Sequence, residues 1–265
     1  MGWPENNPVI VMQKVIEKAH IVIPGDYPLH IANSPHLERL KPHRVTVFTD
    51  LPSSEDEQVN RVCDADIILN SRSQVFWKEN LLRRLPRLAL IATCSIGVDN
   101  IDLLSARELG ILVCNQPGRT ASIVAEHTIA LLMAAAKRTA FFTESMRAGR
   151  WERRDTVYLH GKTLGVIGVG DIGAAVVQLG QALGMKTIAW TLNPDVDRAT
   201  KLGVRFVELD ELLANADAVS IHVKLTETTR GLIGARELAL MRPGSLLINT
   251  ARGPVVDTQA LTVAL

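Results

Sequence analysis

The residues with the clearest chemical meaning are three glycines. Gly168, Gly170 and Gly173 form the pattern G-x-G-x-x-G, after an apolar run over 163–168 and before a helical pattern over 174–183. In that setting the first glycine permits a tight turn, the second lets a pyrophosphate approach the backbone, and the third lets helix and strand pack closely. The helix N-terminus then offers N–H groups to the phosphates. We therefore predict a dinucleotide-binding turn; the alternative is a turn with a structural role alone.

The residues after the next predicted strand bear on which dinucleotide fits. The strand 186–190 runs into Thr191-Leu192-Asn193, and the first carboxylate is that of Asp195. An acidic residue at this place usually binds the adenosine ribose, where it would repel a 2′-phosphate. Arg198 is the nearest candidate cation. The sequence leaves NAD and NADP open, with NAD favoured.

These groups need elements that position them, and the hydrophobic pattern indicates two similar sets. Short apolar runs alternate with helical patterns, which is typical of parallel sheets with crossover helices. Gly110, Gly184 and Gly203 each end a helical pattern before a β-rich run, where a left-handed helix cap is expected. The strands predicted in the first part are 20–23, 44–48, 66–70, 88–93 and 111–114, with helices at 54–63 and 101–109. The strands predicted in the second part are 163–168, 186–190, 204–207, 218–223 and 245–250.

Between the two sets, residues 122–147 carry regularly spaced apolar side chains and contain neither Gly nor Pro. We predict one long helix, buried on more than one face. It is the candidate for an interdomain spine and a dimer contact. A plain core helix is the alternative.

Composition excludes several classes of protein. The 265 residues suggest about two domains. Lys plus Arg is 29, Asp plus Glu is 28 and aromatic residues are 4%, which argues against nucleic acid or an anionic membrane as a partner. No apolar run approaches the roughly 20 residues of a membrane helix. Residues 1–7 lack the pattern of a signal peptide, so we expect a cytoplasmic protein.

The cysteines and histidines predict no metal site. Cys63, Cys94 and Cys114 have no metal-binding spacing, and the histidines show none either. Cys94 and Cys114 lie in apolar strand-like runs, so we predict reduced, buried thiols. His127 falls on the predicted long helix and is interpreted as structural.

The order of further motifs resembles the D-isomer-specific 2-hydroxyacid dehydrogenase family. The run 189–193 is similar to a bacterial subgroup in which the ribose-binding Asp is absent. The matching segments cover most of the chain and are Ser95–Asp102, Val124–Thr128, Gly161–Gly173, Ser220–Val223 with Thr226–Thr229, Met241–Gly244 and Asn249–Asp257.

The resemblance implies an α/β fold with two doubly wound parallel-sheet domains and an active site in the cleft between them. We place a flavodoxin-like substrate domain at 1–118, an interdomain and dimerisation helix at 119–150, and a Rossmann dinucleotide-binding domain, incomplete at its C-terminus, at 151–265. The family transfers a hydride between a nicotinamide ring and C2 of a 2-hydroxy acid. The expected cofactor is NAD, with NADP possible, the expected substrate is a small D-2-hydroxy or 2-keto acid, and the expected assembly is a homodimer.

The resemblance also carries residue roles. Arg252 matches the family's substrate-binding, catalytic Arg; its guanidinium can pair a carboxylate bidentately and polarise the adjacent carbonyl, and a solvated Arg in a turn is the alternative. Ser95, Ile96 and Gly97 match the loop whose backbone N–H groups hold the substrate carboxylate, against the alternative of an ordinary turn. His222 is interpreted as a cofactor-side or packing residue, not as the catalytic His. The residues assigned to the cofactor are Gly168, Gly170, Asp171, Ile172, Gly173, Thr191, His222, Val223, Thr229, Thr250 and Ala251.

The family's general acid–base His, and the Glu that orients it, lie downstream of the Arg252 motif. After Asp257 this sequence contains neither Glu nor His up to Leu265. We therefore expect a truncated oxidoreductase of this family with little or no turnover. The alternative, from another class, is a non-catalytic dinucleotide-binding regulatory module.

Overall fold

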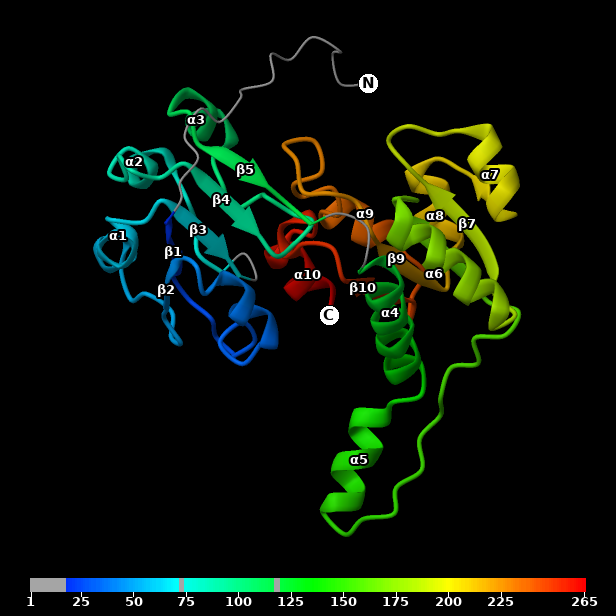
Figure 1. The fold of residues 1–265 in the computed structure, drawn as a ribbon. Helices are drawn as coiled ribbons and strands as arrows, with labels where there is room; N and C mark the ends of the chain where they lie inside the picture. Colours follow the sequence, from blue (N-terminus) through cyan, green and yellow to red (C-terminus); the bar gives the residue numbers. More distant parts are fainter. Residues whose placement is uncertain (1–17, 72–73, 117–119) are drawn as a thin grey trace. The chain divides into compact units, whose positions relative to one another are not determined.

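A computed structural model describes residues 18–71, 74–116 and 120–265. The chain divides into two compact units, Met1–Pro117 and Gly118–Leu265, each built on a five-stranded parallel sheet (Figure 1). The predicted α/β class and the two parallel sheets are confirmed.

The sheet of the first unit has the strand order β2-β1-β3-β4-β5. This order, 2-1-3-4-5, is flavodoxin-like. Its strands are β1 (His20–Ile23), β2 (Arg44–Val47), β3 (Ile67–Asn70), β4 (Leu90–Thr93) and β5 (Leu112–Cys114). Its helices are the 3-10 helix η1 (Pro35–Leu40), α1 (Glu55–Val62), α2 (Glu79–Leu82) and α3 (Leu103–Glu108). The core contains Val22, Ile68, Ile91 and Trp77, all fully buried.

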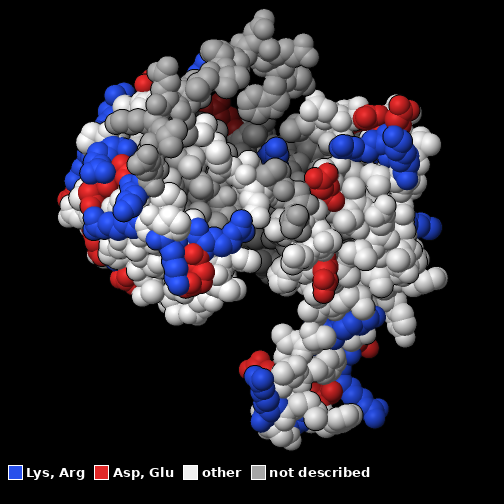
Figure 2. Space-filling model, in the orientation of Figure 1, with Lys and Arg blue, Asp and Glu red and all other residues white. Residues whose placement is uncertain are grey.

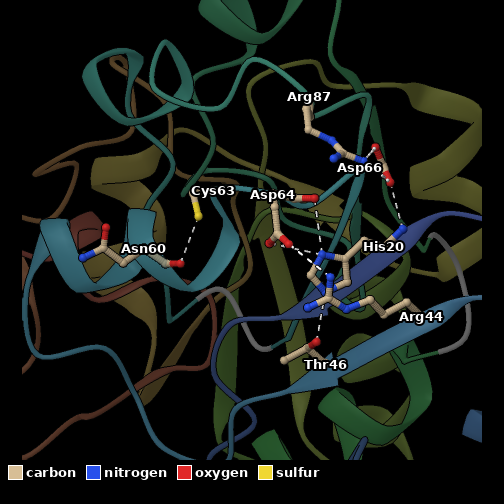
Figure 3. A network of polar contacts seen from close by, with 8 residues as sticks. All are labelled: His20, Arg44, Thr46, Asn60, Cys63, Asp64, Asp66 and Arg87. Atoms are coloured by element: carbon tan, nitrogen blue, oxygen red, sulfur yellow. Dashed lines mark hydrogen bonds and ion pairs between the residues drawn. The ribbon is translucent and has the colours of Figure 1, made fainter.

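A polar network fastens the amino-terminal ends of the first strands (Figure 3). The buried His20 ring lies between Thr46 and Asp64, with Nε2 2.9 Å from Thr46 Oγ1 and Nδ1 3.2 Å from Asp64 Oδ1. The Asp66 carboxylate accepts from His20 N at 2.8 Å and from Arg87 Nη2 at 3.0 Å. These contacts tie β1, β2 and the residues before β3 together, at the edge opposite the carboxyl ends where ligands bind in such sheets.

The sheet of the second unit has the order β10-β9-β6-β7-β8. Counted within the unit this is 5-4-1-2-3, the Rossmann order. Its strands are β6 (Thr163–Ile167), β7 (Lys186–Trp190), β8 (Arg205–Phe206), β9 (Ala218–Ile221) and β10 (Leu246–Asn249). Its helices are α4 (Ala121–Ala136), α5 (Thr139–Arg147), α6 (Asp171–Ala182), α7 (Val196–Leu202), α8 (Leu209–Asn215), α9 (Ala235–Leu240), η2 (Gly253–Val255) and α10 (Thr258–Ala264).

The prediction of one helix over 122–147 is wrong, because the helix breaks between α4 and α5. Arg138 adopts a left-handed conformation with φ 50°. The returning chain supplies the reason: Val157 N donates to the Ala136 carbonyl at 2.9 Å, and Arg138 Nε donates to the Asp155 carbonyl at 3.0 Å. The second segment, α5, projects away from the sheet of its unit (Figure 1).

Burial of α4 on more than one face is also wrong for the described chain. Its buried residues recur every three to four positions, as Ala125, Thr128, Leu132 and Ala136. Ile123, on another face, is 63% exposed. The helix packs one face on α6 and β10. The segment predicted as a separate connector therefore forms part of the second unit.

The predicted burial of the thiols is wrong as well. Cys63, Cys94 and Cys114 are all free and exposed. Cys114 ends β5, which lies at the edge of its sheet, and Cys94 follows the last residue of β4. Apolar neighbours in the sequence indicate a strand, but they do not show whether that strand is central.

Charged side chains of both signs are intermixed over the first unit in the view of Figure 2, in keeping with a formal net charge of +1 for the whole sequence. Among the described residues, no helix combines the length and the apolar character needed to cross a bilayer.

Candidate dinucleotide and substrate sites

The glycine-rich turn connects β6 to α6, and two of its glycines are required by packing. Gly168 has φ +93°, and a Cβ there would lie 2.8 Å from Val223 Cγ1 and 2.9 Å from the His222 carbonyl carbon. A Cβ on Gly173 would lie 1.9 Å from the Gly168 carbonyl oxygen. The helix begins at Asp171, three residues before the predicted pattern, so Gly173 lies inside its first turn.

Gly170 is different, because the fold itself does not require it. Its φ of −76° suits any residue, and a Cβ there would meet nothing within 4 Å. It is the N-cap of α6, a 12-residue helix whose N-terminus has no side-chain cap. The turn therefore leaves backbone N–H groups uncovered beside a space that a side chain at Gly170 would enter. This arrangement fits a pyrophosphate. Asp171 is exposed and Ile172 half-buried at the start of the same helix.

The carboxyl end of β7 borders a hollow of about 410 Å³. Thr191, the predicted cofactor residue here, is half-buried at its wall. Asp195 Oδ1 accepts hydrogen bonds from the backbone N of Asp197 at 2.9 Å and Arg198 at 3.3 Å, so this carboxylate caps α7. The other residues lining the hollow are Trp190, Leu192, Pro194, Phe206, Val207 and Glu208.

The carboxyl end of β9 carries His222 and Val223. His222 Nε2 lies 2.7 Å from Ser220 Oγ, and burial lowers the pKa of His222 to about 4, so the ring is neutral near pH 7. Val223 is buried against the turn at Gly168. Thr229 is fully buried: its hydroxyl donates to the Lys224 carbonyl at 2.5 Å and accepts from the backbone of the same loop. Thr229 therefore shapes the loop and exposes no atom to a cofactor.

The carboxyl end of β10 carries Thr250, Ala251 and Arg252, and two residues that sequence reasoning did not assign fix this turn. Asn249 Oδ1 accepts from Ala251 N at 3.0 Å, and Asn249 Nδ2 donates to the Arg252 carbonyl at 2.9 Å. The buried Thr128 of α4 places its Oγ1 2.8 Å from Thr250 Oγ1. Two sequence signals pointed to Thr128: it ends the family-matching segment Val124–Thr128, and it is a hydroxyl residue on the apolar stripe of a helix.

Because the strands are parallel, the turns after β6, β7, β9 and β10 lie along one edge of the second sheet. The structure thus brings the glycine turn, Thr191, His222 and the 250–252 turn to a common edge. The half-buried Arg252 follows the strand end, with Nη1 3.0 Å from the Ala251 carbonyl. In open α/β sheets this edge is where ligands bind.

The predicted carboxylate loop follows β4 in the first unit. Ser95 Oγ donates to the Gly97 carbonyl at 2.7 Å, and Asn115 Nδ2 donates to the Ile96 carbonyl at 2.9 Å. Within the part of the chain that the structure describes, nothing accepts a hydrogen bond from the N–H groups of Ile96 and Gly97. The loop therefore has its carbonyls engaged and offers N–H donors, which suits an anion.

Comparison with known proteins decides the family. Residues 129–265 match the family model described as D-isomer specific 2-hydroxyacid dehydrogenase, NAD binding domain. The chain belongs to the D-isomer-specific 2-hydroxyacid dehydrogenase family. A glyoxylate reductase of Aeropyrum pernix is 42% identical over 195 residues, which cover 70% of this chain and 58% of that protein. The chain spans 40% to 58% of the length of the first curated relatives that it matches.

Solved structures of similar dehydrogenases and reductases share the fold. A D-lactate dehydrogenase from Aquifex aeolicus, complexed with NAD and lactic acid, has a TM-score of 0.80 and 34% identity, covering 92% of this chain and 72% of that one. An acyclic imino acid reductase in complex with NADPH and D-Arg has a TM-score of 0.80 and 29% identity, covering 93% and 78%. The described residues of this 2-hydroxyacid dehydrogenase family member contain no group of three or more side chains that could hold a metal ion.

Proposed function

We propose that the second unit binds a nicotinamide dinucleotide and that the protein transfers a hydride between this cofactor and a small D-2-hydroxy or 2-keto acid. The observation that carries the proposal is the contrast within the glycine turn. Gly168 and Gly173 are demanded by packing, whereas a side chain at Gly170 would meet no atom within 4 Å, so the space beside the turn is open to a ligand. Membership of the family supports the oxidoreductase class, and related structures hold NAD or NADPH.

In this proposal the backbone of the glycine turn and the start of α6 hold the pyrophosphate. Thr191 lies at the ribose end, and the turn after β10 and the neutral His222 line the sheet edge toward the nicotinamide. When bound, the nicotinamide ring supplies or accepts the hydride. Thr229 contributes through the shape of its loop, because its hydroxyl is buried.

Arg252 and the Ser95–Gly97 loop are proposed to bind the substrate carboxylate. A guanidinium provides two parallel donors for a carboxylate, and it draws electron density from a neighbouring carbonyl as the hydride arrives. The N–H groups of Ile96 and Gly97 are donors of the type that an anion needs. Neither group reads the substrate side chain, so this part of the proposal covers 2-keto acids as a class.

The test begins with cofactor binding and continues with turnover. Titration with NADH and NADPH, followed by nicotinamide fluorescence, is expected to show saturable binding. A panel of 2-keto acids is then added with the reduced cofactor, and oxidation of the cofactor is followed as the loss of absorbance at 340 nm by the reduced ring. Absence of binding by either cofactor refutes the proposal. Oxidation of the cofactor with any acid of the panel supports the dehydrogenase part. Binding with little or no oxidation is the result expected of these residues, because positions 258–265 contain neither Glu nor His, and it leaves only the dinucleotide-binding part supported.

We also propose a homodimer, formed through α4, α5 and the chain that returns from them. These segments leave large apolar side chains exposed in one chain: Ile123 is 63% exposed, Met146 56% and Trp151 78%. Light scattering at increasing concentration is expected to show a dimer, and Trp151→Ser is expected to shift it toward the monomer. A wild-type protein that stays monomeric at high concentration refutes this assignment.

A further inference from the structure

One cation lies directly beside the glycine turn, and the proposed function does not yet use it. Arg198 belongs to the first turn of α7, and its Nη1 donates to the Val169 carbonyl at 2.8 Å. Val169 stands between Gly168 and Gly170. The guanidinium is thus held across the carboxyl end of β7, at the turn where the dinucleotide is proposed to bind.

The charges around this place favour an added phosphate. The residues that follow β7 are Thr191, Leu192 and Asn193, none of which is acidic. The first carboxylate, Asp195, is occupied by the backbone N–H groups at the start of α7. An acidic side chain at the end of the second strand is what normally holds the ribose hydroxyls and repels a 2′-phosphate, and here it is replaced by a hydroxyl and an amide.

The guanidinium also has donors to spare. Among the described residues, Val169 is the one acceptor that Arg198 contacts through its side chain, and it engages Nη1 alone. The remaining N–H groups form a planar fork of the kind that pairs with phosphate oxygens. Because the contact with Val169 fixes the fork in advance, less side-chain entropy is lost when an anion binds.

We infer that Arg198 reads the 2′ position of the adenosine ribose and makes this chain prefer NADP(H) to NAD(H). The inference rests on the proposed dinucleotide site and specifies its ligand. It reverses the preference for NAD taken from the sequence, because the side-chain contact of Arg198 with the turn is visible only in the structure. Thr191 supplies a second donor, its hydroxyl, at the same strand end.

One nearby carboxylate would favour NADH over NADPH. Glu208 lines the hollow from the β8 side and is exposed. If its carboxylate held the ribose hydroxyls, it would favour NADH. The two side chains therefore make opposite predictions about which cofactor binds more tightly and about which substitution changes that order.

The experiment compares NADH and NADPH affinities of the full chain by nicotinamide fluorescence. The wild type is expected to bind NADPH at least about tenfold more tightly than NADH. Arg198→Ala is expected to weaken NADPH binding by about 10- to 100-fold, the loss of a charge-assisted contact, and to leave NADH within about threefold. Arg198→Lys keeps the charge without the fork and is expected to fall between. Raising the salt concentration is expected to reduce the difference in affinity between NADPH and NADH, because salt screens the attraction between Arg198 and the 2′-phosphate.

Two further variants make the comparison specific. Arg205→Ala removes an equal charge from the amino end of β8, where Arg205 pairs with Glu211 at 2.8 Å, and both affinities are expected to stay unchanged. Glu208→Gln is expected to leave NADH binding unchanged. A loss of NADH affinity in Glu208→Gln, or tighter binding of NADH than NADPH by the wild type, overturns the inference.

The remaining outcomes separate this inference from the proposed function. If Arg198→Ala weakens both cofactors equally while its thermal unfolding matches the wild type, Arg198 supports the turn and does not select the 2′ group, which overturns the inference alone. If the wild type binds neither cofactor, the proposed function fails together with it.

Discussion

Replacing Gly170 by Val separates dinucleotide binding from folding. A Cβ at this position meets no atom within 4 Å, and the backbone, with φ −76° and ψ −163°, lies in the extended region open to any residue. The folded chain is therefore expected to lose at most about 1 kcal/mol of unfolding free energy, the difference between Gly and Val at a helix N-cap.

The effect on cofactor affinity is expected to be larger. The added side chain enters the space through which a pyrophosphate reaches the N–H groups at the start of α6. Each charge-assisted hydrogen bond is worth about 1.5–3 kcal/mol. Loss of a single one weakens binding by about tenfold or more.

Gly173→Ala is the matched control, because this substitution is expected to lower the stability of the fold, whereas Gly170→Val is expected mainly to lower cofactor affinity. The new Cβ would lie 1.9 Å from the Gly168 carbonyl oxygen, so α6 must move away from the turn. Overpacking of this kind costs about 1–3 kcal/mol, and here we expect the upper part of that range. Urea unfolding and NADPH titration on the same preparations measure both quantities. The reasoning is refuted if Gly170→Val binds the cofactor like the wild type, or if it unfolds as readily as Gly173→Ala.

Three other predictions concern polar groups. Thr128→Val removes the partner of Thr250 Oγ1 and is expected to cost about 1 kcal/mol of stability and weaken cofactor binding, with Thr128→Ser restoring both; an unchanged affinity would contradict this. Folding lowers the pKa of His222 from 6.5 to about 4, so on acidification the unfolded chain takes up the proton first. The free energy of unfolding is therefore expected to fall by up to about 3 kcal/mol as the pH drops from 6.5 to 4. In denaturant titrations, His222→Gln is expected to reduce this dependence of stability on pH. Burial raises the pKa of Asp26, but hydrogen bonds from the N–H groups of Ala32, Ile31 and His30 outweigh burial and lower the pKa below 3.8. The ionised Asp26 carboxylate therefore stabilises the fold above pH 3.8, and this stabilisation is lost on further acidification. Asp26→Asn is expected to lower the free energy of unfolding at pH 7 by about 1–3 kcal/mol, measured by urea unfolding.

The strands and the glycine turn could be predicted because each depends on local pattern. Strands buried on both faces of a parallel sheet are unbroken apolar runs. A left-handed residue between a helix and the next strand is usually Gly, so a Gly at that place predicts this conformation. Gly110, Gly184 and Gly203 have φ of +71°, +74° and +58°, as predicted. The flavodoxin-like and Rossmann classes of the two sheets came from the family resemblance, since local pattern does not specify which strands pair.

The break after α4 depends on residues distant in sequence and was missed for that reason. Lys137 and Arg138 are ordinary helix formers. The helix ends because the chain returning at Asp155 and Val157 bonds to Ala136 and Arg138. The burial of Thr229 could not be predicted either. Its assignment to the cofactor came from the family resemblance, whereas in the fold its hydroxyl bonds within its own loop.

In the proposed dinucleotide site of the second unit, shape and selectivity would reside in different groups. Packing glycines set the turn, and buried polar side chains such as Asn249 and Thr128 set the strand-end loop, so the phosphates and the nicotinamide would meet mainly backbone. Backbone donors recognise any dinucleotide, because NAD and NADP share the same pyrophosphate. Under the inference, discrimination comes from a side chain at the rim, the guanidinium of Arg198, and Glu208→Gln tests it. A substitution at the rim is therefore expected to change which cofactor binds, and a substitution in the turn to change whether any does.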